Sequence, residues 1–510
     1  MSGTGPFSAR TASSTRVGPV RAAPIAGAYA GAMRSQSLAL SLESGGSLPL
    51  SRRIAGAIIQ AIRDGRLKSG ASLPGTRALA SSLGVHRNTV IAAFLLLEQE
   101  GWIESRPGSG SFVREDLPGP ARPRIVQSSV PAFPFVFPAE SASEVLDGRI
   151  NLRDLVPDGR IFPTQDWVRS YHHALQGSHR TGLGDKDPRG FLPLRRELAK
   201  LLAERRGISC TAQDIVLIPS PMRGLDLVAR MLLRPGDAVA VEEPGHPETR
   251  AVLRNAGARL LPIPVDREGM EIDRLAGFSG EDRPRLVLVT PGLQYPTGVA
   301  LSEGRREALL RWSFTAKTPV LEDDTWGLLD LSVPPRPALA GQDRTGSVLH
   351  VGSLGPALAP GLQVGYFVAH PEVVEHAARR WRKLNLGVDP FVAHALAEWL
   401  EEGLFHRQLR RARGLYKARL ALATAWARDR AGGIPAAPQG GLGLWLRCPG
   451  LRPGFQARAA AQGILVQRPE PFWFGPPREG GLFLAIGAQD AESLPAILER
   501  LGELLDQDAE

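Results

Sequence analysis

Cysteine and lysine are both scarce in this chain of 510 residues. Its two cysteines, Cys210 and Cys448, are too few for a disulfide framework or a structural zinc site. We therefore predict no metal site and a reducing, cytoplasmic location. The sequence also lacks any run of about eighteen apolar residues, so no helix that crosses a membrane is expected.

Length and charge favour a multidomain protein with a polyanionic partner. The chain is too long for one compact core, so at least two domains are expected. The formal net charge of +9 favours binding to polyanions, although it does not locate the binding surface.

Two segments of biased composition divide the chain. Residues 1–46 are rich in Ser, Ala, Gly and Pro, which predicts a disordered N-terminal extension, and translation starts at either Met1 or Met33. Residues 115–148 predict an extended linker because prolines recur through them, at Pro118, Pro120, Pro123, Pro131, Pro134 and Pro138. The domains then span 47–114 and 149–510.

Residues 149–510 alternate short β-branched runs with longer amphipathic stretches. This alternation predicts an α/β domain with a mainly parallel sheet. Helices are expected near 225–234 and 303–313. Strands are predicted at DIVLI (214–218), DAVAVEE (237–243), RLVLVT (285–290), PVLEDD (319–324) and VLHVGS (348–353).

Residues 48–113 show the pattern of a winged helix-turn-helix, an α+β fold. Apolar residues recur at helical spacing from Ile54 to Ile62, and Asp64-Gly65 ends that helix. Thr76 is expected to cap a second helix, Gly84 turns the chain, and Arg87 to Gln99 form a third helix. Two short strands around a glycine-rich wing follow in WIESRPGSGSFV.

The third helix of this block is predicted to enter the major groove of double-stranded DNA. Arg pairs bidentately with guanine and Asn with adenine. Residues 47–114 hold nine Lys and Arg against four Asp and Glu, which suits phosphate contact. The side chains at the start of the helix are His86, Arg87, Asn88 and Thr89.

The block resembles the winged helix of the GntR family, through DGRLKSGASLPGTRALASSLGV, HRNTV and EGWIESRPGSGSFV. This resemblance implies that Arg77 and Arg87 contact operator DNA. His86, Asn88 and Thr89 would lie beside them, and Gly108 and Gly110 would shape the wing.

The rest of the chain resembles the fold-type I aminotransferase domain that is fused to GntR regulators in the MocR subfamily. The similar segments are INLRDLVPDGRIFPTQDW (150–167), GDKDPRG (184–190), VEEPGHP (241–247), TPGLQYPTG (290–298), EDD (322–324) and VGSLGPALAPGLQVGY (351–366). The family implies a homodimer and pyridoxal phosphate as cofactor.

Two cofactor-binding residues carry over from the family. Asp323 matches the carboxylate that holds the pyridine nitrogen protonated, and Ser353 matches a hydroxyl on the phosphate side. Other positions differ. Thr325 stands where the family has Tyr, Ile218-Pro219-Ser220 replaces the phosphate loop, and Gln363 replaces an arginine. His246 is expected to pack over the pocket where the family has an aromatic residue.

Proline occupies the position of the lysine that forms the Schiff base. Pro356 has no amine, so we predict no catalytic residue and at most non-covalent binding of pyridoxal phosphate. A register error that lets another lysine such as Lys383 reach the pocket is the alternative, although Gly352, Pro360, Gly365 and Tyr366 hold the register.

The sequence therefore predicts a DNA-binding transcription regulator whose large domain serves as an effector or dimerisation body without transamination. One alternative is a functional regulator or aminotransferase that depends on pyridoxal phosphate. Another is a purely structural dimerisation domain. Whether a small-molecule effector binds, which operator is read, and whether the effect is activation or repression stay open.

Overall fold

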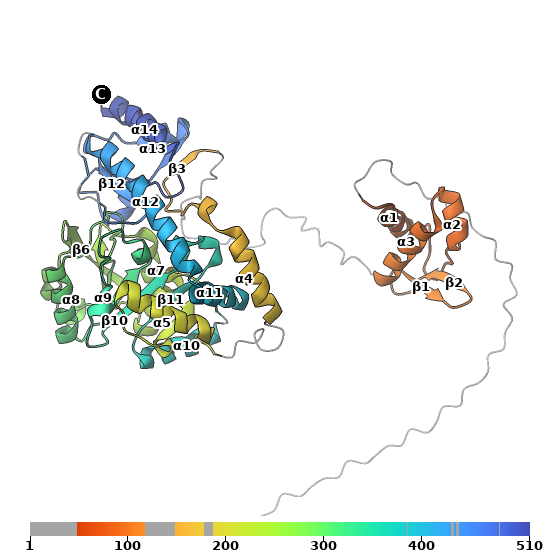
Figure 1. Ribbon diagram of the computed structural model, residues 1–510, viewed down its shortest axis with the longest axis horizontal. Coiled ribbons are helices and arrows are strands. Elements are labelled where there is room, and N and C mark those ends of the chain that lie inside the picture. The colour runs from red at the N-terminus through yellow and green to blue at the C-terminus, as the bar shows by residue number, and fades with distance from the viewer. Residues whose placement is uncertain are drawn as a thin grey trace, which may run out of the picture. The chain divides into compact units, whose positions relative to one another are not determined.

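The computed structural model describes residues 48–117, 148–177, 187–384, 386–429, 433–434, 438–478 and 480–509. They form two compact units, within Met1–Ser141 and Ala142–Glu510, which are described separately (Figure 1). The extension predicted for 1–46 and most of the linker predicted for 115–148 lie outside the described residues. Within the described ranges, no single helix is long and apolar enough to cross a bilayer.

The first unit is a winged helix. Its elements are α1 (Leu50–Arg63), α2 (Thr76–Leu83), α3 (Arg87–Gln99), β1 (Ile103–Arg106) and β2 (Gly110–Val113). Gly84 closes α2 in the left-handed conformation at φ +64°, which favours glycine because it has no Cβ. The expected cap at Thr76 is wrong: Gly75 is the N-cap, and Thr76 is the first helical residue. Its hydroxyl instead accepts a hydrogen bond from Arg87 Nε at 3.4 Å.

The core of this unit forms where the three helices meet the hairpin. Ile58, Val90, Leu97 and Ile103 are at most 1% exposed. Arg63 lies over the buried ring of Trp102, 5.2 Å from its centroid, and so covers one side of the core. The apolar positions predicted at helical spacing therefore form one contiguous core.

The second unit is built on an eight-stranded sheet with the order β4-β11-β10-β9-β8-β5-β6-β7. The central strands run parallel, and β11 is antiparallel to both of its neighbours. The strands are β4 (Ile215–Ile218), β5 (Ala238–Glu243), β6 (Arg259–Asp266), β7 (Gly269–Met270), β8 (Leu286–Val289), β9 (Val320–Asp324), β10 (Val348–Ser353) and β11 (Gly365–Val368). The predicted α/β class with a mainly parallel sheet is confirmed.

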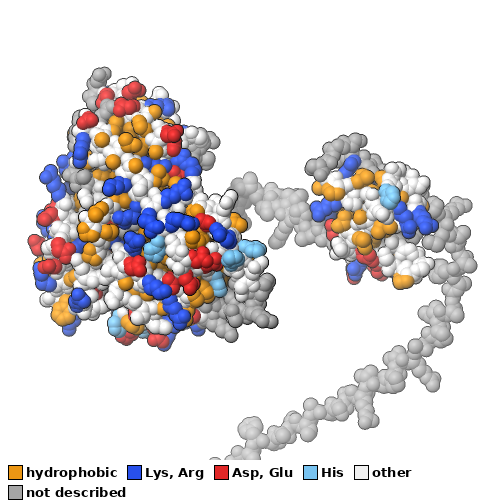
Figure 2. All heavy atoms as spheres, in the orientation of Figure 1, with side chains coloured by type: hydrophobic (Ala, Val, Ile, Leu, Met, Phe, Trp, Pro, Cys, Tyr) orange, Lys and Arg blue, Asp and Glu red, His pale blue; other side chains and the backbone are white. Residues whose placement is uncertain are grey.

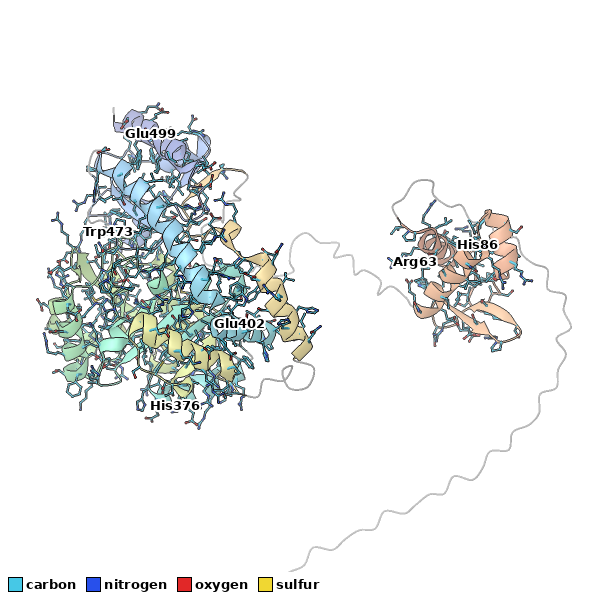
Figure 3. The ribbon with its side chains drawn as sticks, in the orientation of Figure 1. Arg63, His86, His376, Glu402, Trp473 and Glu499 are labelled. Carbon is cyan, nitrogen blue, oxygen red and sulfur yellow. The ribbon has the colours of Figure 1, made fainter. Side chains whose placement is uncertain are left out.

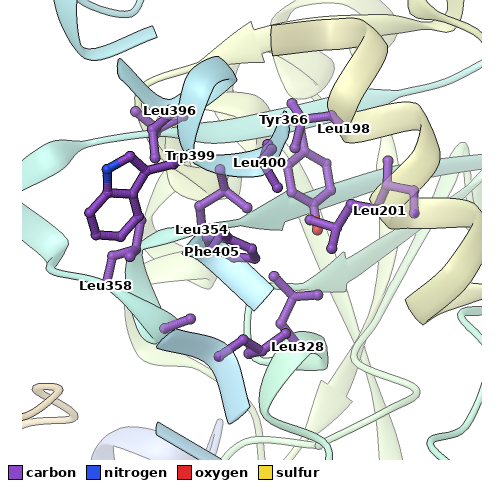
Figure 4. Packing of buried hydrophobic residues seen from close by; sticks show 14 of the residues in the cluster. Leu198, Leu201, Leu328, Leu354, Leu358, Tyr366, Leu396, Trp399, Leu400 and Phe405 are labelled. Atoms are coloured by element: carbon purple, nitrogen blue, oxygen red, sulfur yellow. The ribbon is translucent and has the colours of Figure 1, made fainter. Parts of the chain in front are cut away.

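Helices cover both faces of the sheet, because successive side chains of a strand point to opposite faces. On β4, Leu217 joins one apolar cluster, with α5, α11 and α12, whereas Val216 joins another, with α6, α7 and α10. Figure 4 shows the first cluster around Tyr366, Trp399 and Phe405. The helices are α4 (Thr164–Gly177), α5 (Leu192–Arg206), α6 (Pro221–Leu232), α7 (Pro247–Asn255), α8 (Glu303–Ala316), α9 (Leu339–Gln342), α10 (Pro371–Lys383), α11 (Pro390–Glu401) and α12 (Leu404–Arg428).

Helix α6 begins earlier than the predicted 225–234 because local capping starts it. Ser220 is the N-cap and accepts a hydrogen bond from Arg223 N at 3.3 Å, and Pro221 occupies the first helical position.

A smaller layer at the C-terminus packs on α12. It contains α13 (Phe455–Ala461) and α14 (Leu494–Ala509) over the strand pairs β12 (Gly443–Arg447) with β14 (Gly481–Ala485), and β13 (Ile464–Val466) with β3 (Ile150–Leu152). Because β3 precedes the main sheet in sequence, this layer ties the two ends of the domain together.

Replacing Leu97 by alanine should loosen the winged helix. Leu97 is 0% exposed, so its loss is expected to cost about 2–5 kcal/mol of unfolding free energy. Leu95→Ala on the same helix is the matched control, because Leu95 is 53% exposed and its loss should cost less than about 0.5 kcal/mol. Hydrogen exchange of the α1 and α3 amides in the full chain measures the difference; equal exchange in the two variants would contradict this core.

Candidate functional site

The start of α3 carries the side chains predicted to read DNA. Arg87 and Asn88 are exposed in its first turn, Thr89 is half-buried, and Arg77 is exposed on α2. The bond from Arg87 to Thr76 links the two helices at the turn. His86 lies at the surface (Figure 3), and its Nδ1 accepts a hydrogen bond from Asn88 N at 3.3 Å. Its ring therefore caps the helix and leaves Nε2 for any other contact.

The wing is a tight hairpin. Arg106 pairs with Gly110 across it, and Ser109 N donates to the Arg106 carbonyl at 3.0 Å. Gly108 and Gly110 have φ of +76° and +107°, which residues with a Cβ rarely adopt. Arg106 covers Phe112 at 4.9 Å and pairs with Glu104. Basic side chains are visible on this unit in Figure 2.

A pocket of about 200 Å³ lies in the second unit, at the carboxyl ends of β4, β5, β8 and β9. Ligands of open α/β sheets bind at this edge. The pocket is lined by Ser220, Pro221, Met222, His246, Thr290, Leu293, Tyr295, Asp323, Asp324, Thr325, Trp326 and Gly327.

Two carboxylates line the pocket, Asp323 and Asp324. Of these, Asp323 is the one without a cationic partner among the described residues. Its Oδ1 accepts hydrogen bonds from the backbone N–H of Thr325 at 3.0 Å and from the Thr325 hydroxyl at 2.5 Å. Among the described residues it has no Lys, Arg or His partner within 4.0 Å. Thr325, where the resemblance implies Tyr, thus orients Asp323.

A buried network lies behind the pocket. Arg206 donates two hydrogen bonds of 2.7 Å to the two oxygens of Asp324, and both residues are less than 5% exposed. Burial alone would lower the pKa of Arg206, but the Asp324 carboxylate outweighs it and holds that pKa above the ordinary 12.5. The guanidinium therefore stays charged.

Glu322 is the second carboxylate of this buried network. It contacts His350 Nδ1 at 2.9 Å and accepts hydrogen bonds from Leu339 N and Ala340 N at 2.7 and 2.9 Å. Burial would raise the pKa of Glu322, yet His350 and these amides lower it to about 2. Glu322 thereby anchors the start of α9 to the sheet.

Glu242 lies on β5 and His246 follows that strand; His246 lines this pocket, and both residues line a small adjoining recess. The Glu242 carboxylate accepts hydrogen bonds from the backbone N–H and the hydroxyl of Thr290. Burial raises the pKa of Glu242 to about 7. The His246 ring lines the pocket, as expected, with its centroid 4.9 Å from that of Tyr295. Burial lowers the His246 pKa.

Of the positions that the resemblance assigns to the phosphate side, Ser220 lines this pocket, whereas Ser353 and Gln363 do not. Pro356 is buried in a short 3-10 turn, and Gln363 is exposed at φ +48°. The Ser353 hydroxyl accepts from Gly355 N at 3.0 Å and donates to the Val364 carbonyl at 3.4 Å. The pocket thus brings Asp323 together with His246 but not with Ser353.

No lysine of the described ranges lines the pocket. Lys383, the candidate for an alternative register, lines a separate hollow beside Met231 and Leu232 on the outside of α6 and α10. Lys186 lies outside the described residues.

Three residues at or next to the pocket were not predicted from the sequence: Trp326 lines it, Glu242 lines the adjoining recess, and Arg206 binds Asp324. Arg206 has no local signal, because its partner Asp324 is 118 residues away along the chain. Glu242 and Asp324 are parts of VEEPGHP and EDD, but these motifs do not show which of their carboxylates line the pocket and which lie beside or behind it.

Family comparisons match both units. Residues 155–486 match the aminotransferase class I and II family, and residues 50–113 match the gntR family of bacterial regulatory proteins. The HTH-type transcriptional regulator TauR of Rhodobacter capsulatus is 30% identical over 91% of this chain and 98% of its own. The chain belongs to the HTH-type transcription regulators of the MocR and GntR family.

Other relatives agree with this assignment. The probable rhizopine catabolism regulatory protein MocR of Rhizobium meliloti is 29% identical over 74% of this chain and 77% of its own. Among solved structures, kynurenine aminotransferase of Pyrococcus horikoshii has a TM-score of 0.66 at 25% identity and covers 71% of this chain and 92% of its own. Pyridoxal phosphate is therefore the cofactor that the family leads one to expect.

The buried Glu242 should make this MocR-like regulator less stable as the pH rises. Its pKa is raised from 4.5 to about 7, so the folded state holds a proton that the unfolded state releases between these values. Its stabilising contribution is complete below pH 4.5 and is lost as the pH rises through about 7. Over this window the unfolding free energy should fall by up to about 3 kcal/mol, at 1.36 kcal/mol per pKa unit.

Urea unfolding at pH 5 and pH 8 measures this effect. Glu242→Gln should reduce the difference between the two pH values. The control Glu268→Gln should leave it unchanged, because Glu268 is exposed. An unaltered pH dependence in Glu242→Gln would show that Glu242 is ionised throughout.

Proposed function

We propose that this regulator reads operator DNA as a homodimer through Arg77 and the start of α3, and that its large domain senses a small molecule without aminotransferase chemistry. The observation that carries this proposal is the pairing of a complete winged helix with a proline at the position of the Schiff-base lysine. The chain therefore keeps the part that reads DNA and lacks the amine on which aminotransferase chemistry depends.

DNA reading rests on the exposed first turn of α3. Arg87 and Asn88 are exposed there and are of the types that form bidentate pairs with guanine and adenine. The wing hairpin with Gly108 and Gly110 would contact the sugar-phosphate backbone of the DNA beside the major groove. Two copies of this unit in a dimer would read two half-sites whose spacing follows the dimer geometry.

The homodimer is supported by apolar side chains on the large domain. Val168 and Leu175, seven residues apart on α4, are 59% and 40% exposed. Side chains seven apart share one face of a helix, so they form an apolar stripe that a second copy would cover.

Pyridoxal phosphate fits this pocket poorly. The carboxylate for a ring nitrogen is present in Asp323. An amine is missing at Pro356, and the Ser353 hydroxyl is engaged by Gly355 and Val364. Without an arginine at position 363 a charge-assisted contact worth about 1.5–3 kcal/mol is missing, and no covalent link can form at position 356. The alternative function, a regulator or aminotransferase that depends on pyridoxal phosphate, rests on Asp323 and on the family.

Reduction with borohydride after incubation with pyridoxal phosphate separates these functions. Because position 356 is proline, we expect no adduct on any lysine of the large domain by peptide mass spectrometry. An aminotransferase with its active-site lysine, treated in parallel, should become labelled. A stoichiometric adduct on one lysine of this chain would establish the alternative.

Replacing Arg87 by alanine should weaken specific DNA binding. A bidentate contact to guanine is worth about 1–3 kcal/mol, so affinity is expected to fall by about five-fold to 150-fold. Duplexes selected from a random pool by the wild-type protein supply the probe, and fluorescence anisotropy measures affinity. Arg66→Ala is the matched control, because Arg66 is exposed but pairs with Asp64 after α1. Equal affinity and base preference in the two variants would contradict the recognition helix.

A further inference from the structure

The charge of the pocket conflicts with the phosphate that the family leads one to expect. Its lining holds two carboxylates, Asp323 and Asp324, and no Lys or Arg among the residues that the structure describes. Arg206 neutralises Asp324 from behind through two hydrogen bonds. The charge of Asp323 is left facing the cavity, so the pocket attracts cations and repels a phosphate dianion.

The helix end that faces the pocket offers little to an anion. Pro219 and Pro221 have no N–H, and Arg223 N is already bound by the Ser220 hydroxyl at 3.3 Å. The Arg223 side chain is exposed and does not line the pocket. The cap therefore occupies part of the positive end of α6, and the N–H of Met222 is the first-turn donor that stays beside the pocket.

One guanidinium lies in an adjoining recess. Arg250 lines it together with Thr249, but the recess has only about 20 Å³ of space, roughly enough for one water molecule. Arg250 also donates to the Pro471 carbonyl and stacks on Phe474 at 4.6 Å. A phosphate group has no room beside it.

The walls of the pocket suit a flat, positively charged ring. His246, Tyr295 and Trp326 line it, and the Tyr295 ring is braced by Phe472 and Phe483 at 5.3 and 4.8 Å. Aromatic faces attract cations, and a carboxylate in a partly buried site stabilises a protonated nitrogen. The volume of about 200 Å³ suits a molecule with one ring.

We propose that this pocket binds a small aromatic cation without a phosphate group, such as a protonated nitrogen heterocycle or arylmethylamine, with Asp323 as its counter-ion. Thr325 orients Asp323 through one oxygen and leaves the other for the ligand. This inference rests on the proposed sensing role of the large domain and names the class of its ligand.

Isothermal titration of the full-length protein with two matched ligand pairs tests the proposal. Benzylamine and benzyl alcohol differ in charge, whereas pyridoxamine and pyridoxamine 5′-phosphate differ in phosphate. We expect the cation of the first pair and the unphosphorylated member of the second to bind at least tenfold more tightly. Equal or tighter binding of the alcohol or the phosphate, or no binding of either cation, would overturn the proposal.

Variants then assign the counter-ion. Asp323→Asn should weaken pyridoxamine binding at least tenfold, whereas Asp273→Asn should leave it unchanged because Asp273 is exposed on the surface. If Asp323→Asn does not fold, Thr325→Val removes the orienting hydroxyl and should weaken binding with a smaller change in structure. Unchanged affinity in a folded Asp323→Asn protein would refute Asp323 as the counter-ion.

A DNA-binding assay separates this proposal from the sensing role. Pyridoxamine at saturating concentration should change the affinity for the selected duplexes in wild type but not in Asp323→Asn. Binding of the cation without any effect on DNA would uphold the site and overturn the sensing role. DNA binding with no cation binding would overturn the site alone.

Discussion

The ion pair between Arg206 and Asp324 is the interaction on which the large domain depends. It joins the end of α5 to the end of β9, and both partners are almost fully buried. Removing one partner of such a pair leaves an unpaired buried charge, which costs about 3–5 kcal/mol. The space around it is equally constrained, since a Cβ on Gly327 would lie 2.2 Å from the Asp324 oxygens. The pair therefore fixes the strand end that presents Asp323.

Strand alternation explains how three consecutive acidic residues acquire different roles. Glu322 and Asp324 face the same side of β9 and are held by His350 and Arg206, whereas Asp323 faces the opposite side. Two of the three charges are thus compensated within the fold, and the third is available to a ligand. This division makes the pocket acidic even though the chain as a whole is basic.

The elements with strong local signals were predictable. Helix α3 coincides with the predicted Arg87–Gln99. The buried strands β4, β5, β8, β9 and β10 lie within the predicted runs. A strand that is buried on both faces needs a continuous apolar run, and the sequence shows such runs directly. The cap of α2 was mispredicted, since Thr76 bonds to Arg87 instead of capping its own helix. Arg206 and Trp326 carried no signal, because their place in the site depends on contacts between distant segments.

The sequence by itself determined the two-part architecture, the winged helix and the absence of an amine at position 356. Each of these depends on residue identity or on local periodicity, which a sequence displays directly. Only the tertiary structure decided which carboxylate is neutralised, which hydroxyl is already engaged, and which side chains line the pocket. Those properties arise from the through-space partners of each group, as between Arg206 and Asp324, and such partners are far apart in the chain.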